Sequence, residues 1–154
     1  MIAYSEALQH LLDAATPLPT ERLPLHEAGG RTLASDVISE QSLPPFDNSA
    51  MDGFALRANG AAFDSGTEFT VQGWQAAGDA GAEGGEGAWE IMTGARMPSG
   101  LDTVVPVENV EILASEDGRP TRIALKGAVK PGQHVRLRGQ DVSDGERVLQ
   151  AGQV

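Results

Sequence analysis

The sequence predicts a mainly β (α+β) protein with one helix at its N-terminus. Its 154 residues include 19 Gly and 9 Pro but only two Trp, one Tyr and four Phe, a composition that indicates tight turns between short elements and not a helical bundle. Short runs rich in β-branched and aromatic residues recur between these turns. Helical spacing of apolar residues is clear near the N-terminus.

The predicted N-terminal helix begins with Ser5 as its capping residue. Its apolar side chains recur at i, i+3, i+4 and i+7, at Leu8, Leu11, Leu12 and Ala15. Pro17 and Pro19 end it, because proline cannot continue a helix. After the Gly29-Gly30 break, residues 31–38 are compatible with a short helix that runs into a strand.

Strands are expected through the middle of the chain, at 69–74, 90–92 and 103–107. The runs 110–114 and 121–125 flank Glu116-Asp-Gly118 and predict a hairpin whose loop is long enough to need no type I′ turn. We therefore expect a β-rich body over 45–131. The two chain ends, 1–44 and 132–154, are expected to form a second, smaller unit.

Charge and composition exclude several classes of protein. With 11 Lys+Arg against 22 Asp+Glu, the formal charge is −11, so a generic nucleic-acid binder is excluded. The absence of cysteine excludes disulfides and thiolate metal sites. No apolar run approaches the ~18–20 residues that span a bilayer, and the N-terminus carries no basic leader. A cytoplasmic protein without a membrane partner is the expectation.

The positive charge is concentrated in one stretch. Residues 1–118 carry four basic and 19 acidic side chains, whereas residues 119–147 carry seven basic and three acidic ones. The C-terminal stretch is therefore where the local field favours an anionic ligand, unless it is simply a solvated strand face.

The densest cluster of polar side chains lies at 43–56. Asp47 and Asp52 bracket an Asn-Ser pair between rigid prolines and a glycine. We interpret this stretch as a loop that positions a ligand or a hydrated Mg²⁺. The alternative is that Asp47 and Asn48 only satisfy their own backbone in an Asx-turn.

Two further loops carry glycines. Residues 92–100 combine two glycines with Arg96, which suits a carboxylate or phosphate, although an ordinary turn explains the pattern equally well. Residues 78–87 contain three acids and no base, so we interpret them as a mobile surface loop that repels phosphate.

Five stretches, in order, carry a more specific pattern: 30–37, 43–56, 91–100, 102–108 and 135–142. Together they resemble the N-terminal region of the molybdopterin molybdenumtransferase family, the MoeA proteins and the related E domain of gephyrin. The string Asp47-Asn-Ser-Ala-Met-Asp-Gly53 is the most specific match. Arg96 departs from the family pattern, since relatives often carry an uncharged residue there.

The resemblance implies a transferase of molybdenum cofactor biosynthesis in the full-length protein. Such an enzyme inserts molybdenum from molybdate into adenylyl-molybdopterin, with release of AMP and with Mg²⁺ as cofactor. It also implies a β-rich cleft domain at 45–131, an elongated linker and dimerisation domain at 1–44 with 132–154, and a homodimer. Partners would include the molybdopterin-adenylylating protein and other proteins of the pathway. The nucleotide-handling and C-terminal domains would follow Val154, so the isolated chain is expected to be inactive.

Residue by residue, the resemblance assigns five positions. Asp52 and Thr93 match catalytic positions of the family, with Asp52 also the metal ligand, and Arg136, Asp141 and Ser49 match positions expected to bind the cofactor. A non-catalytic interaction or scaffold module of the same fold is the alternative function. A free-standing Mg²⁺-dependent phosphohydrolase, which rests on Asp47 and Asp52 alone, ranks last.

Overall fold

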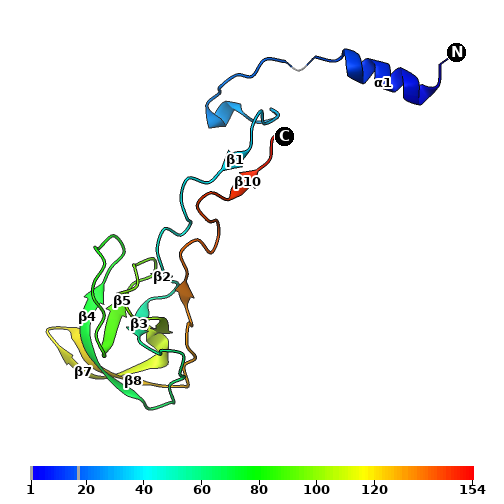
Figure 1. The fold of residues 1–154 in the computed structure, drawn as a ribbon. Coiled ribbons are helices and arrows are strands. Elements are labelled where there is room, and N and C mark those ends of the chain that lie inside the picture. Colours follow the sequence, from blue (N-terminus) through cyan, green and yellow to red (C-terminus); the bar gives the residue numbers. More distant parts are fainter. Residues whose placement is uncertain (1, 17) are drawn as a thin grey trace. The chain divides into compact units, whose positions relative to one another are not determined.

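The computed structural model describes residues 2–16 and 18–154, which form two compact units (Figure 1). Unit 1 comprises Met1–Val37 with Leu149–Val154, and unit 2 comprises Ile38–Val148. Strands dominate the described residues and α1 is the one α-helix among them, so the mainly β fold class is confirmed. The sequence-based domain limits, after residue 44 and before residue 132, fall within unit 2 and stay a prediction.

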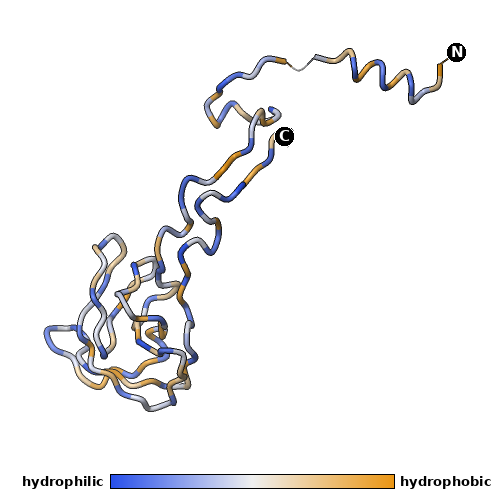
Figure 2. Tube along the Cα trace, in the orientation of Figure 1, coloured by the Kyte–Doolittle hydropathy of each residue, from blue (hydrophilic) through white to orange (hydrophobic). Residues whose placement is uncertain are grey.

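Unit 1 contains α1 (Tyr4–Ala14) and the 3₁₀ turn η1 (Leu25–Glu27). The helix is preceded by Ala3 as N-cap, and no side chain caps it. The predicted Ser5 cap is wrong, because Ser5 lies inside the first turn. The helix ends at Ala14, as expected, while Pro17 lies outside the described residues. Apolar and polar residues alternate around α1 (Figure 2), yet none of its residues is buried.

The two chain ends run beside each other in extended backbone. Within unit 1, Leu33 N–H donates to the Gln153 carbonyl at 2.8 Å and Gly152 N–H donates to the Leu33 carbonyl at 2.8 Å. The strand β1 (Val37–Ile38) pairs with β10 (Arg147–Leu149). The short helix considered for 31–38 does not form, because this segment makes extended pairings with the C-terminal residues.

Unit 2 is built on a six-stranded sheet in the order β6-β3-β5-β4-β8-β7. Its strands are β3 (Gly53–Leu56), β4 (Glu68–Gln75), β5 (Ala88–Ile91), β6 (Thr103–Pro106), β7 (Val110–Glu116) and β8 (Arg119–Leu125). Only β4 and β5 pair in parallel, and the other neighbours are antiparallel. Each strand run predicted from the sequence has a counterpart here, within a few residues. Among the described residues, no helix is long and apolar enough to cross a membrane.

The hairpin β7–β8 differs from its prediction in the turn. Glu116 pairs with Arg119, so the turn consists of Asp117 and Gly118 alone. Both have positive φ, 48° and 79°, as a type I′ turn requires. The prediction of a longer loop without such a turn is therefore wrong, and the Asp-Gly pair explains why, because these two residue types tolerate left-handed backbone.

The central strand β3 was not predicted, because its four residues do not alternate between apolar and polar. All four are buried. Successive side chains of a strand point to opposite faces, so Phe54 and Leu56 enter one apolar cluster while Ala55 enters another. A strand that is buried on both faces gives no period-two pattern.

The acidic glycine-rich segment 78–87 is a surface loop only in its first half. Residues 78–81 are exposed, whereas Gly87 is buried. Gly84 N–H donates to the Ser99 carbonyl at 3.1 Å, and Ser99 N–H donates to the Ala82 carbonyl at 2.8 Å. A Cβ on Gly87 would lie 2.4 Å from the Thr70 carbonyl oxygen. The glycines of the second half therefore allow close packing onto the sheet.

Candidate functional site

Three of the sequence motifs lie side by side in unit 2, with the segment 43–52 in the middle. On one side, Ser49 N–H donates to the Ala95 carbonyl at 3.0 Å, and Gly94 N–H donates to the Ser49 carbonyl at 2.8 Å. On the other side, β2 (Asn48–Ser49) pairs with β9 (Val135–Arg136) in antiparallel register. The middle segment is thus a short strand held from both edges, and the prediction of a simple loop was wrong here.

Asp52 and Thr93 form a hydrogen-bonded pair at the exposed edge of this arrangement. Thr93 donates twice to Asp52 Oδ1, from its backbone N–H at 2.6 Å and from its hydroxyl at 2.7 Å. The two residues are 41 positions apart in the sequence. The sheet brings them together. Gly53, the first residue of β3, is in register with Ile91, the last residue of β5, so Asp52 just before β3 lies beside the turn 92–95 just after β5.

These two hydrogen bonds lower the pKa of Asp52. The Thr93 backbone N–H and then its hydroxyl lower the pKa of the Asp52 carboxyl below its ordinary value of 3.8, and burial opposes them only weakly. The carboxyl would be ionised at neutral pH even with its ordinary pKa, and the two hydrogen bonds stabilise this ionised form further. Its second oxygen, Oδ2, accepts no hydrogen bond from the part of the chain that the structure describes, so it is available to a ligand.

Gly53 sets the direction in which Asp52 leaves the sheet. A Cβ built on Gly53 would lie 2.0 Å from the Val105 carbonyl oxygen. Only a glycine allows β3 to approach β6 this closely. The Val107 N–H, just after β6, also donates to the Asp52 carbonyl at 3.0 Å, so the β6 side holds the Asp52 backbone in place.

The donor set fits Mg²⁺ only in part. Residues 2–16 and 18–154 contain no group of three or more His, Cys, Asp or Glu side chains that would hold a metal. Mg²⁺ often uses only one or two protein carboxylates and completes its shell with water and substrate phosphates. Asp52 Oδ2 is compatible with such a single ligand, provided that the other ligands come from substrate or from another part of a protein.

Arg136 and Asp141, both predicted to bind cofactor, are paired with each other. Arg136 Nη2 lies 2.5 Å from Asp141 Oδ2, and the two side chains are 45% and 52% exposed. Neither makes a hydrogen bond or ion pair with Asp52 or Thr93 within the described ranges. The structure places them beside the same middle segment, since Arg136 is in register with Asn48.

Ser49 and Asp47 are used within the fold. Ser49 is 1% exposed, and its hydroxyl donates to the Met51 carbonyl at 2.5 Å and accepts from the Met51 N–H at 3.2 Å. Asp47 Oδ1 accepts from the Arg138 N–H at 2.7 Å. Both side chains therefore shape the segment that carries Asp52, and the cofactor-binding role expected for Ser49 stays a prediction.

Sequence reasoning missed Arg138 and Asp102. Arg138 lines a hollow together with Arg96, and the alternating run 133–138 gave a signal for it. Asp102 accepts from the Ala58 and Asn59 N–H groups at 2.8 and 2.9 Å and from the Thr103 hydroxyl at 2.9 Å. Burial raises its pKa, but these hydrogen bonds outweigh burial and hold the pKa below its ordinary value. Asp102 begins the stretch 102–108 of the family pattern, but that pattern assigned it no role.

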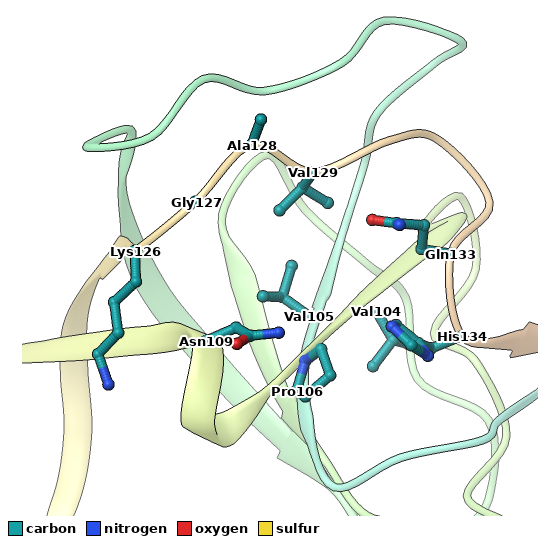
Figure 3. Close-up of a pocket in the computed structure, with 10 residues that line it drawn as sticks. All are labelled: Val104, Val105, Pro106, Asn109, Lys126, Gly127, Ala128, Val129, Gln133 and His134. Atoms are coloured by element: carbon teal, nitrogen blue, oxygen red, sulfur yellow. The ribbon is translucent and has the colours of Figure 1, made fainter.

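A second hollow, of about 260 Å³, lies beside β6 (Figure 3). The side chains of Val104, Val105 and Val129 form its apolar wall, and the polar ends of Asn109, Gln133 and His134 lie around it. Lys126 Nζ donates to the Glu108 carbonyl at 2.9 Å. None of the residues predicted from the sequence lines this hollow.

The fold and the three motifs define a class of protein. The family model described as the MoeA N-terminal region (domain I and II) matches residues 2–154, and the chain belongs to this family. The resemblance inferred from the sequence is thereby confirmed.

Named relatives agree. The chain is 38% identical to the molybdopterin molybdenumtransferase of Synechococcus elongatus and 38% identical to that of Haemophilus influenzae, and each match covers 99% of the chain. The molybdopterin biosynthesis moeA protein from Pyrococcus horikoshii OT3 is similar in structure, with a TM-score of 0.78 and 37% identity over 98% of the chain. The chain spans only 38%, 37% and 40% of these three proteins.

Proposed function

We propose that the chain supplies part of the active site of a molybdopterin molybdenumtransferase, which inserts molybdenum from molybdate into adenylyl-molybdopterin with release of AMP. The hydrogen-bonded Asp52–Thr93 pair is the observation that carries this proposal. It joins two motifs of the family at an exposed edge, and it leaves one carboxylate oxygen without a hydrogen bond from the described residues.

The physical role proposed for the pair is to hold a fixed negative charge. The two donors from Thr93 orient the Asp52 carboxylate and keep it ionised. Oδ2 then contributes one ligand to Mg²⁺, with water and substrate phosphate as the others. Mg²⁺ would supply charge neutralisation at the phosphate and molybdate oxygens.

Exchange of the carboxylate for an amide tests this role. In a full-length transferase that carries this chain, we expect Asp52→Asn to lower the rate of molybdenum insertion about 100-fold or more, because the charge at Oδ2 is lost. Insertion is measured as molybdenum cofactor formed from adenylyl-molybdopterin and molybdate at several Mg²⁺ concentrations. Thr93→Ser keeps both hydrogen-bond donors and is expected to retain most of the activity. Thr93→Val lacks the hydroxyl donor and is not expected to retain it.

Asp64→Asn is the matched control, because Asp64 is exposed and its side chain makes no hydrogen bond among the described residues. Equal melting temperatures for all variants exclude a folding defect. Full activity in Asp52→Asn at every Mg²⁺ concentration would contradict the proposed role. Binding of partner proteins without any binding of molybdopterin species would favour the scaffold alternative.

We further propose that the chain forms a homodimer through the apolar side of α1. The side chains of Leu8, Leu11 and Leu12 are 42%, 71% and 60% exposed, although a soluble helix normally buries such a stripe. We expect sedimentation of the chain to show a dimer, and Leu11→Glu to shift it to a monomer. His10→Glu on the opposite side of α1 introduces the same new charge and should leave the dimer intact. A monomer at high concentration would contradict the proposal.

A further inference from the structure

Two arginines share one open hollow on unit 2, of about 410 Å³. Arg96 comes from the turn after β5, and Arg138 follows β9. Most of the other lining residues are apolar, among them Phe46, Met97 and Leu101, and Asp47 also lines the hollow. The hollow therefore combines two guanidinium groups with an apolar wall.

Arg96 is held in place by an aromatic ring. Its Cζ lies 4.4 Å from the centre of the Phe46 ring, a favourable cation–π distance. The backbone supports this stacking, because Met97 N–H donates to the Asp47 carbonyl at 2.9 Å and keeps the two segments adjacent. A guanidinium that stacks through its face still has its N–H groups in its plane available to an acceptor.

Arg138 is anchored through its backbone. Its N–H donates to Asp47 Oδ1 at 2.7 Å, which fixes the chain where the side chain reaches the hollow. The Asp47 carboxylate thus has one oxygen engaged, and it reduces the positive charge of the hollow without cancelling both guanidinium groups.

Neither arginine forms an ion pair with a carboxylate in the described part of the chain. Four other arginines do, namely Arg31, Arg119, Arg122 and Arg136. Acidic residues outnumber basic ones two to one, 22 against 11. Two guanidinium groups share this hollow with one carboxylate, that of Asp47, and neither forms an ion pair with it. This excess of positive charge indicates a site whose anion comes from outside.

We propose that this hollow binds a phosphate monoester, with Arg96 and Arg138 on the phosphate oxygens and the apolar wall against the organic group. Guanidinium forks match phosphate oxygens in geometry and charge. Ser99, exposed at the rim, offers a hydroxyl as a further donor. The proposal goes beyond the transferase function, since it needs neither molybdenum nor the Asp52–Thr93 pair.

Direct titration of the chain tests the proposal. The probes are phenyl phosphate, inorganic phosphate and phenol, followed by nuclear magnetic resonance of the backbone and arginine side-chain N–H groups. We expect saturable binding of phenyl phosphate with shifts confined to the N–H groups of residues 46–47, 96–97, 99–101 and 138. Inorganic phosphate should bind several-fold more weakly because it leaves the apolar wall empty, and phenol should not bind at these concentrations.

Four variants distinguish a specific binding site from non-specific charge attraction. Arg96→Gln and Arg138→Gln should each weaken phenyl phosphate binding about tenfold or more, since each removes a charge-assisted hydrogen-bonding group. Arg96→Lys keeps the charge but loses the fork, so an intermediate affinity is expected. Arg122→Gln removes one positive charge on β8 and should leave the affinity unchanged.

The outcomes are distinct. Equal weakening by Arg122→Gln and Arg96→Gln would overturn the proposal in favour of non-specific charge attraction. Shifts that do not saturate, or that map outside the hollow, would also overturn it. Equal melting temperatures of the variants are required, because Arg96 also stacks on Phe46. Loss of transferase activity in Asp52→Asn has no bearing on any of these results.

Discussion

Units 1 and 2 differ in where they place their apolar side chains. In unit 2, the sheet buries Phe54, Leu56, Ile91, Ile123 and others to 1% exposure or less. In unit 1, the helix α1 contains no buried residue, and Leu18 and Leu25 are 88% and 91% exposed. Folding stability in water scales with buried apolar area. Unit 2 therefore contains the source of stability and the candidate site, whereas unit 1 presents apolar surface outward.

A pair of truncations makes this comparison quantitative. We expect Ile123→Ala to lower the free energy of unfolding by about 3–4 kcal/mol, because it opens a cavity at a fully buried position. Leu25→Ala, at a 91% exposed position of unit 1, should cost less than about 0.5 kcal/mol. Both tryptophans, Trp74 and Trp89, lie in unit 2, so their fluorescence during urea unfolding reports that unit. Similar losses in both variants would contradict the comparison.

The close approach of β3 to β6 gives the next effect in size. We expect Gly53→Ala to destabilise the chain by about 2–3 kcal/mol, because the new methyl group collides with the Val105 carbonyl and the backbone must move. Gly127→Ala is the control, since a Cβ there meets nothing within 4 Å. Thermal unfolding measures both. If Gly53→Ala were as stable as Gly127→Ala, this result would show that β3 and β6 can move apart at little cost in free energy.

The smallest expected effect concerns Asp102, whose charge ties 58–59 to the start of β6. Its folded pKa lies below the ordinary value of 3.8, so its stabilisation is fully present above that value and is lost as pH falls through the folded pKa. We expect Asp102→Asn to cost about 1–2 kcal/mol at pH 7. The difference in free energy of unfolding between Asp102→Asn and the unsubstituted chain should be smaller at about pH 2–3 than at pH 7. A difference independent of pH would assign the effect to geometry alone.

The sequence was informative where local chemistry decides the structure. Strand-forming residues and turn residues located the strands β4 to β8 of unit 2, and the motif around Asp52 located one half of the candidate pair. The pairing of Asp52 with Thr93 depends on the register of β3 with β5. Because β3 is buried on both faces, its residues do not alternate between apolar and polar. The sequence therefore gave no signal for this strand or for its register.

Other features depend on contacts between distant residues. Arg138 and Arg96 share a hollow only because 43–50 runs between their two segments. Arg136 meets Asp141 five residues away, a pairing that spacing allows but does not require. The helix start was mispredicted for a local reason, since α1 begins one residue before Ser5 and uses no side-chain cap.

Hydrogen bonds that join the two ends of unit 2 determine where the chain can be divided. Ser39 N–H donates to the Glu146 carbonyl at 2.8 Å, and Gly145 N–H donates back to the Ser39 carbonyl at 2.9 Å. The first and last residues of the segment 38–148 therefore lie close to each other, as the two ends of an inserted domain do. Joining its two ends adds only a short loop with a small closure entropy. The unit that carries the candidate site is therefore suited to excision, circular permutation and transplantation into a host loop.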